Sequence, residues 1–184
     1  MKKLLLLICL LPALCQAREL TFSGGGGITF AGLSGNGYSY DPMAAPSGML
    51  SAAIGLRSLK AGVRADLFQV KGQLTYTDAR GNEYKERFAY YDPALSFSAF
   101  VAKVFHHRIL EVSIGMNAGI VTGVSQTMML SSNSNPGFSI GIDAGVTHYF
   151  HKHLGVFANL SPRYIFNRTD ALAFPLNLGI SYRL

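Results

Sequence analysis

The chain has 184 residues, with 16 lysines and arginines against 10 aspartates and glutamates, and its two cysteines, Cys9 and Cys15, lie near the N-terminus. The positive charge is not gathered into a basic run, which gives no support to nucleic-acid binding. If the N-terminal segment is removed, the mature chain has no cysteine, and disulfides, cysteine–zinc sites and cysteine nucleophiles are excluded.

The N-terminus has the pattern of a secretory signal. Met1-Lys2-Lys3 precedes an apolar run from Leu4 to Leu14, and small residues precede a cut after Ala17. The apolar run is too short for a membrane-spanning helix, and no later run reaches about 18 apolar residues. We therefore predict a cleavable signal over residues 1–17 and one mature domain over residues 18–184, with a formal charge of +4 (6 − 2).

The mature chain opens with a predicted strand, Leu20 to Phe30, that contains Gly24–Gly27. A phosphate-binding loop would need a helix after the glycines, and the sequence continues into Ile28-Thr29-Phe30 instead. Relief of crowding in a tightly closed sheet is the better interpretation of these glycines. Glycine, asparagine, aspartate and proline then predict a loop from Ser34 to Ser47.

Two strands and two turns are predicted next. Gly48–Ser58 is followed by a turn near Leu59-Lys60 and by a strand whose apolar face changes phase after Leu67. Because one extra residue swaps the faces of a strand, we expect a bulge at Leu67-Phe68, with Phe68 on the outward apolar face beyond it. Asp78–Asn82 is a predicted hairpin loop.

The strand that starts at Leu110 carries the strongest signal. Glu83–Phe105 and a turn at His106–Arg108 precede it, and over Leu110–Ser125 the even positions are apolar while the odd positions are mostly small or polar. This period of two indicates a strand with two unlike faces, far longer than the usual ~5–6 residues. The remaining predicted elements are a loop over Ser131–Gly137, a strand over Phe138–Thr147, a turn at His151–His153, a strand over Leu154–Phe166, a loop over Asn167–Asp170 and a strand over Leu172–Leu184.

Eight long alternating strands predict the fold class: an all-β, eight-stranded, antiparallel, up-and-down transmembrane β-barrel. Short turns alternate with longer loops, which indicates loops outside the cell and both termini in the periplasm. Aromatic residues gather near both strand ends, as expected of two interfacial girdles.

In these features the mature chain resembles the small eight-stranded outer-membrane barrels, such as OmpX and the transmembrane domain of OmpA. Members of that family usually end on an aromatic residue, whereas this chain ends Tyr182-Arg183-Leu184. The resemblance implies a monomer in the bacterial outer membrane. It also implies two kinds of partner: outer-membrane lipids, including lipopolysaccharide, and the barrel-assembly machinery during insertion.

Several charged residues fall on the predicted inward face. An eight-stranded barrel encloses little more than its own side chains, so charges there must be paired. We predict a neutralising lumen network, in which Arg163 and Arg183 are the candidate partners of Glu111 and the register decides the pairs; a narrow or gated ion path is the alternative. The predicted network consists of Arg64, Asp66, Lys71, Glu111, Asp143, Arg163 and Arg183.

The sequence favours a structural or surface-contact role without catalysis or a cofactor. Within the predicted loop Ser34–Ser47, Tyr38, Tyr40 and Met43 are the best candidates for an external contact, although a loop outside the membrane is also simply tolerated. A soluble ligand-binding barrel is disfavoured, because it would expose too much apolar surface.

The positions of the histidines bear on two further alternatives, a lipid A-modifying enzyme and a metal site. A lipid A-modifying enzyme of the deacylase type would need a serine nucleophile and a histidine base near the outer leaflet. The five histidines, which lie at or near the predicted inner turns, are His106, His107, His148, His151 and His153. We therefore expect no catalytic site, and no metal site either, because flexible turns seldom hold ligands in a defined geometry.

Overall fold

A computed structural model describes residues 19–35, 38–77, 80–123, 136–166 and 170–184. The predicted signal 1–17 lies outside the described residues, as does most of the predicted loop Ser131–Gly137. The strands are β1 (Glu19–Gly35), β2 (Tyr38–Leu56), β3 (Leu59–Thr77), β4 (Glu83–His107), β5 (Leu110–Gly123), β6 (Gly137–Tyr149), β7 (Leu154–Leu160), β8 (Arg163–Phe166) and β9 (Asp170–Arg183).

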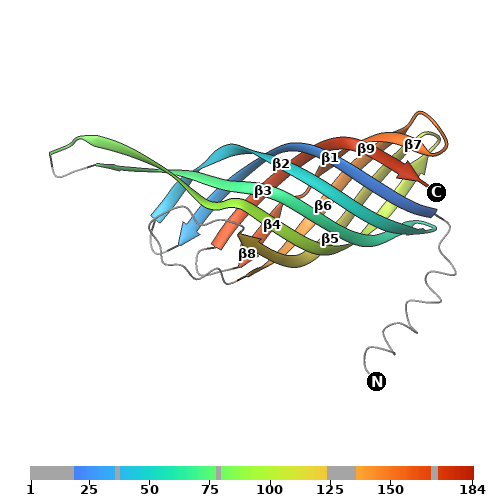
Figure 1. The fold of residues 1–184 in the computed structure, drawn as a ribbon, viewed down its shortest axis with the longest axis horizontal. Coiled ribbons are helices and arrows are strands. Elements are labelled where there is room, and N and C mark those ends of the chain that lie inside the picture. The colour runs from blue at the N-terminus through green and yellow to red at the C-terminus, as the bar shows by residue number, and fades with distance from the viewer. Residues whose placement is uncertain (1–18, 36–37, 78–79, 124–135, 167–169) are drawn as a thin grey trace, which may run out of the picture.

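The strands form one closed antiparallel barrel (Figure 1). Each strand pairs with its neighbours in sequence, and β1 pairs with β9 from Thr21–Arg183 to Ser34–Asp170, which joins the two edges. β7 and β8 are two parts of one barrel strand, since both lie between β6 and β9. The prediction of an eight-stranded antiparallel barrel is confirmed.

Two prolines explain the break between β7 and β8. The register with β9 is the same on both sides of the break, with Leu160 opposite Leu176 and Arg163 opposite Ala173. Pro162 lies in the gap and Pro175 faces it from β9, and neither has an N–H group to donate to a ladder. Their carbonyl oxygens still accept hydrogen bonds, from the Ile142 amide to Pro162 (2.9 Å) and from the Ser161 amide to Pro175 (3.0 Å). The wall therefore stays closed across the break.

The two faces of the wall differ as the alternation predicts. Large apolar side chains cover the outside, and Leu50, Met116 and Leu178 are 68%, 73% and 60% exposed. Inward positions hold buried polar or small residues such as Asn117 and Ser181. Among the residues that the structure describes, none belong to a helix with the length and apolarity that a bilayer crossing requires.

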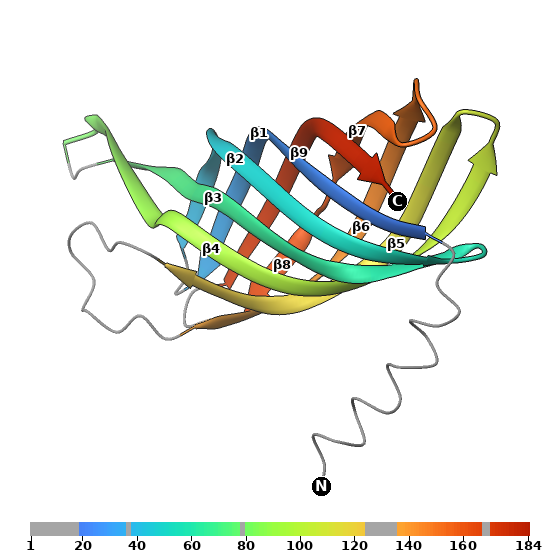
Figure 2. The same cartoon turned by 45° about the vertical axis from the view of Figure 1, so that its right-hand side comes forward.

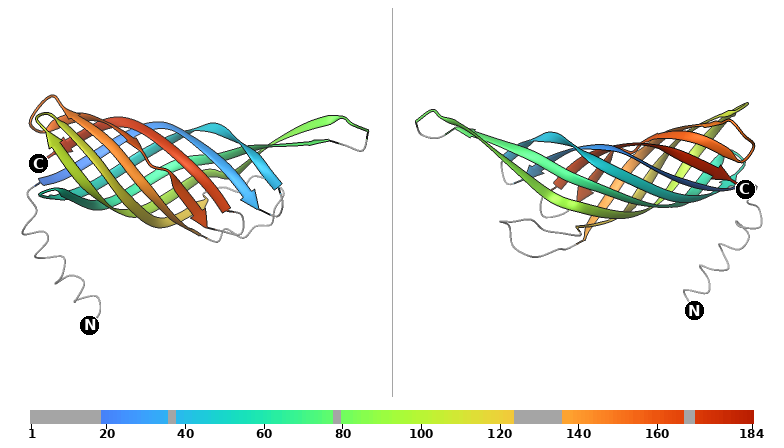
Figure 3. Two further views of the ribbon diagram at one scale, coloured as in Figure 1. Left: turned by 180° about the vertical axis from the view of Figure 1, so that it is seen from behind. Right: turned by 45° about the horizontal axis from the view of Figure 1, so that its top comes forward.

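The two ends of the barrel are unlike. At one end, here called the termini end, β1 begins, β9 finishes and three short connections join β2 to β3, β4 to β5 and β6 to β7. At the opposite end, here called the far end, the β3–β4 hairpin extends well beyond the other strands (Figures 2 and 3). Its register continues to Thr77 opposite Glu83, so this extension is a regular two-stranded ribbon.

The short turns lie one or two residues from their predicted places. The β2–β3 turn is at Arg57-Ser58, not Leu59-Lys60, and the β4–β5 turn is at Arg108-Ile109, not at His106–Arg108. Arg57 and Arg108 adopt positive φ angles of 55° and 53°, a conformation that alternation in the sequence does not reveal for a non-glycine residue. The β6–β7 turn includes the predicted His151–His153.

The predicted loop Ser34–Ser47 is wrong. β1 continues to Gly35 and β2 begins at Tyr38, so strand pairing fills this segment except at residues 36–37, which are not described. The prolines that suggested a loop are accommodated as irregularities instead: the β2–β3 register is broken between Pro42 and Ser47. This position tolerates a proline, because all that a proline lacks is the backbone N–H that would donate to the ladder.

The predicted bulge in β3 exists but lies later in the strand. The β3–β4 register shifts between Phe68 and Val70 and again before Lys71, so Phe68 keeps the phase of Arg64 and Asp66. Phe68 is 1% exposed and lies inside the barrel, which contradicts the expectation that it joins the outward face. The sequence pattern could not separate an inward aromatic ring from an outward one beside a register shift.

The glycines of β1 allow β1 and β9 to approach closely. A Cβ atom at Gly25 or Gly27 would overlap the carbonyl oxygen of Leu178 or Leu176, respectively, on β9. A Cβ atom at Gly26, which is on the outward face, would meet only the Ser47 carbonyl oxygen at 3.4 Å. Gly25 and Gly27 are therefore required by the closing seam, and Gly26 is not.

We predict that Gly27→Ala weakens barrel closure by about 1–3 kcal/mol or more, because the added methyl group meets backbone that cannot rotate away. The matched variant Gly26→Ala should fold as the parent does. Gel mobility of unboiled protein, which separates closed from unfolded barrels, measures both. Equal closure of the two variants would contradict this account of the seam.

Candidate functional site

Four charged side chains cross the middle of the lumen. Arg64 on β3 donates to Asp143 on β6 (Nη1 to Oδ1, 2.6 Å) and to its own strand neighbour Asp66 (Nε to Oδ2, 3.1 Å). Arg163 on β8 forms an ion pair with the same Asp66 oxygen (2.8 Å). All four residues are buried, and two guanidinium groups face two carboxylates, so the set is neutral as a whole.

Uncharged side chains complete this set. Ser161 Oγ accepts from both arginines, at 2.8 Å from Arg64 and 3.2 Å from Arg163, and Asn117 donates to Asp143 (3.1 Å). Arg163 also donates to Ser96 (3.0 Å). We call these residues the lumen belt: Arg64, Asp66, Ser96, Asn117, Asp143, Ser161 and Arg163. Because the belt joins strands on opposite sides of the barrel, it obstructs the lumen at mid-height.

The lumen on the far side of the belt is apolar. Phe68, Val121 and Ile165 are at most 1% exposed and form one cluster with inward-facing alanines. The guanidinium carbon of Arg163 lies 5.6 Å from the centre of the Phe68 ring, so belt and cluster are in contact. We call this cluster the apolar plug: Ala31, Phe68, Ala94, Val121, Ile165, Ala171 and Ala173. Ser139 is also buried at this level, opposite Ile165, so the described lumen here is mainly but not wholly apolar.

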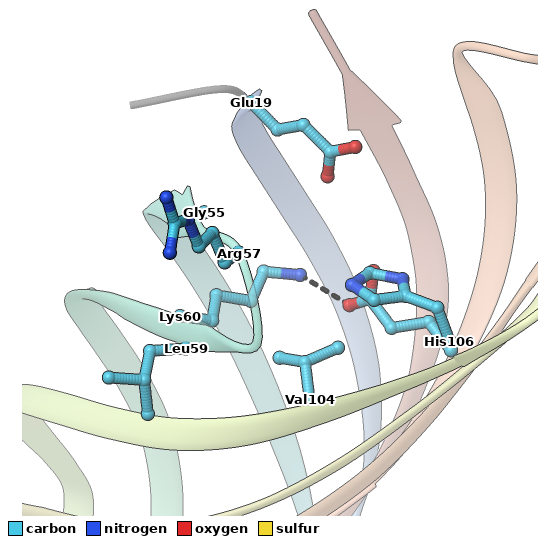
Figure 4. Close-up of a pocket in the computed structure, with 8 residues that line it drawn as sticks. Glu19, Gly55, Arg57, Leu59, Lys60, Val104 and His106 are labelled. Carbon is cyan, nitrogen blue, oxygen red and sulfur yellow. Dashed lines mark hydrogen bonds and ion pairs between the residues drawn. The ribbon is translucent and has the colours of Figure 1, made fainter. Parts of the chain in front are cut away.

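The lumen on the other side of the belt is hollow and is lined by charged and apolar residues together. A cavity of about 250 Å³ opens at the termini end between Glu19, Lys60, His106 and neighbouring residues (Figure 4). Lys60 Nζ lies 2.7 Å from Glu111 Oε1, and His106 Nδ1 lies 3.9 Å from the other oxygen of that carboxylate. Beyond this pair a smaller cavity of about 70 Å³ extends to Arg64 and Asp143. The interior is thus a blind cup that opens at the termini end.

The predicted pairing of Glu111 with Arg163 or Arg183 is wrong. Glu111 pairs with Lys60, and Arg183 lies 3.5 Å from Glu19 and stacks on the Tyr149 ring at 4.0 Å. Alternation gives the side of the wall on which a charge lies, but the partner depends on register and height in the barrel. Lys60 was missed because the sequence placed it in a turn.

The structure brings together Arg64, Asp66, Asp143 and Arg163 from the predicted network and places Glu111 and Arg183 nearer the rim. Lys71 is on β3 opposite Ala89, and its side chain lies outside the described ones.

The candidate contact residues Tyr38, Tyr40 and Met43 lie on β2, not on a loop. Their backbones pair with Gly35, Leu33 and Ala31 of β1. Of the three, Met43 is half-buried, and the side chains of the two tyrosines are not described. Any external contact by these residues would therefore take place at the rim of the far end. Their backbones are already paired with β1 there.

The histidines all lie at the termini end. The rings of His151 and His153 are 5.9 Å apart, and His153 Nδ1 is 2.7 Å from the Arg183 carbonyl oxygen. Within the described ranges, no three His, Cys, Asp or Glu side chains form a group that could hold a metal ion.

Comparison with known proteins relates the fold to solved structures. No protein-family model matches the sequence, and no curated protein matches it. Neisserial surface protein A superposes with a TM-score of 0.59 at 13% identity, over 89% of this chain and 96% of that one. The outer-membrane protein OprG of Pseudomonas aeruginosa gives a TM-score of 0.53 at 11% identity, over 92% and 97%. This chain has the fold of the small eight-stranded outer-membrane β-barrels.

Proposed function

We propose that this protein is an integral outer-membrane barrel with a structural or surface-contact role in the cell envelope and no catalytic activity. One observation carries the proposal: large apolar side chains cover the described outer wall on every strand of a barrel that has no open edge. Soluble monomers rarely expose a continuous apolar patch of more than a few hundred Å². Lipid tails would cover this wall, and the closed ladder leaves no strand edge unpaired in the bilayer.

The unequal ends support an orientation. Outer-membrane barrels have short turns in the periplasm and longer connections outside the cell. We therefore propose that the termini end is periplasmic and that the β3–β4 hairpin is extracellular. The exposed tip of this hairpin, residues 80–84, is then the part best placed for surface contact. The start of β2, with Tyr38 and Tyr40, lies at the same end of the barrel but does not reach as far as this tip.

This orientation also supports the absence of catalysis. Lipopolysaccharide would surround the far end, whereas the histidines that could act as bases lie at the termini end. The partners in this proposal are the outer-membrane lipids, including lipopolysaccharide, and the assembly machinery that inserts the barrel.

A narrow channel is the second candidate, and the cup is the observation that favours it. Water and ions could enter from the termini end as far as Arg64 and Asp143. To pass further they would have to break the hydrogen bonds of the belt and enter the plug. In the plug, Phe68 and Ile165 belong to one apolar cluster with the inward-facing alanines. The belt–plug arrangement therefore favours a closed barrel.

We predict that the protein fractionates with the outer membrane and migrates differently on gels before and after boiling, because a closed barrel resists detergent until heated. Protease added to intact cells should cleave the β3–β4 hairpin and leave the short turns of the termini end intact. A soluble periplasmic protein without a heat-dependent shift would rule out the proposed function.

We predict no single-channel steps from the parent protein in planar bilayers. Phe68→Ala alone should also be silent, because the belt still spans the lumen. The combination Phe68→Ala, Ile165→Ala and Arg163→Ser, which removes the two largest side chains of the plug and one of the two belt arginines, should produce small steps if it folds. If the parent protein gave conductance steps as large as those of the triple variant, the channel would be the favoured function.

The belt should also contribute to stability. Arg163→Met leaves Asp66 with one partner in place of two, and breaking a buried ion pair typically costs about 3–5 kcal/mol. We expect a clearly lower urea midpoint for Arg163→Met, a smaller loss for Arg163→Lys, and none for the exposed control Lys152→Gln. Equal midpoints for all three would show that the belt is not a stabilising network.

A further inference from the structure

The apolar outer wall is interrupted at one place by basic side chains. On β4, Lys103 faces outward between Val101 and Phe105, and His107 follows at the end of the same strand. Leu110 on β5 is opposite both His107 and His148, so these two histidines flank it on neighbouring strands. We call Lys103, His107, Arg108 and His148, all of them exposed, the basic wall patch.

This patch is exceptional on the barrel. Among the described side chains of the closed wall, Lys103 is the one outward-facing strand residue that carries a permanent charge. Such a residue is costly against lipid tails unless its ammonium group reaches the level of the headgroups. Lys103 lies near the termini end of β4, so its ammonium group needs to extend only a short way to reach the level of the headgroups.

No described carboxylate at the termini end neutralises the patch. The two acidic residues there, Glu19 and Glu111, are on inward positions of β1 and β5. Each already has a basic partner, Arg183 at 3.5 Å for Glu19 and Lys60 at 2.7 Å for Glu111. The patch therefore presents uncompensated positive charge to the outside of the wall.

The surroundings of the patch suit an amphipathic ligand. Phe105, Ile109 and Phe150 are 50%, 56% and 60% exposed and border the basic groups. Lys103 Nζ lies 5.3 Å from the centre of the Phe105 ring, which holds the ammonium group against the wall at the aromatic girdle. Apolar contact and positive charge are thus available at one depth.

We propose that the basic wall patch binds the phosphate headgroup of an anionic glycerophospholipid in the leaflet that surrounds the termini end. Lys103 and Arg108 supply the charge, and the His107 and His148 rings offer N–H donors to phosphate oxygens. The acyl chains lie along Phe105 and Ile114, which is opposite Lys103 on β5. This inference rests on the proposed membrane location.

The absence of tryptophan from the chain makes a direct test simple, because a single introduced tryptophan reports without background. Phe105→Trp places the reporter in the patch and retains a ring beside Lys103. Phe22→Trp is the matched control: it replaces an exposed aromatic residue near the same end, on β1, where the cross-strand neighbours are Ala52 and Tyr182. Each variant is reconstituted in phosphatidylcholine vesicles that contain a small fraction of brominated phosphatidylglycerol, and fluorescence quenching measures local lipid occupancy.

We expect phosphatidylglycerol to be enriched roughly fivefold at position 105 relative to position 22, the preference given by about 1 kcal/mol for one basic side chain near anionic lipid. Lys103→Gln in the Phe105→Trp background should remove most of the enrichment, and Lys103→Arg should retain it. Added salt should reduce it, because exposed charges are screened.

Two readouts keep this inference separate from the proposed function. Brominated phosphatidylcholine should quench both reporters, and both variants should keep the heat-dependent gel shift. If neither reporter is quenched by any brominated lipid, the membrane location is wrong. If both are quenched by phosphatidylcholine but phosphatidylglycerol shows equal occupancy at the two positions, or an enrichment that Lys103→Gln does not change, the headgroup site is overturned.

Discussion

The pairing of β1 with β9 is the constraint on which the rest of the structure depends. It removes the only two edges that a linear series of strands would leave, and a backbone N–H or C=O without a partner is very costly away from water. The seam requires Gly25 and Gly27 because a side chain at either position would occupy the backbone of β9. The closed wall has a mostly apolar outward face, interrupted by the basic wall patch, and its inward side chains must fit a narrow lumen.

The interior is divided into three layers that behave differently. The cup at the termini end is hollow and carries charged side chains, each charge of the lumen belt has an oppositely charged partner, and the plug toward the far end is apolar. A buried charge is tolerated only with a partner, so Asp66 serves both arginines and Ser161 accepts from both. The arrangement favours a sealed barrel in the envelope over a conducting one.

Alternation in the sequence was enough to predict the strands, their order, the closed barrel and the inward side of Arg64, Asp66, Asp143 and Arg163. It could not predict contacts that depend on register, so Glu111 was given the wrong partner and Lys60 was overlooked. It also failed where strands are irregular: prolines that suggested a loop before Gly48 lie in a strand, and Phe68 faces inward. The apolar plug does leave a signal in the sequence, since Ile165, Ala171 and Ala173 make the far-end parts of β8 and β9 apolar on both faces.

Pro162 between β7 and β8, and Pro175, which faces that gap from β9, have a consequence for local motion. At Ser161 and Pro162 the ladder lacks the donors that Pro162 and Pro175 would otherwise supply, so the wall is held there by fewer backbone bonds than elsewhere along β7 and β8. Ser161 is also the residue whose hydroxyl group accepts from Arg64 and Arg163. Side-chain bonds that span the lumen thus compensate for a weakness in the wall, and breathing of the barrel at this height is coupled to the pairing of its buried charges.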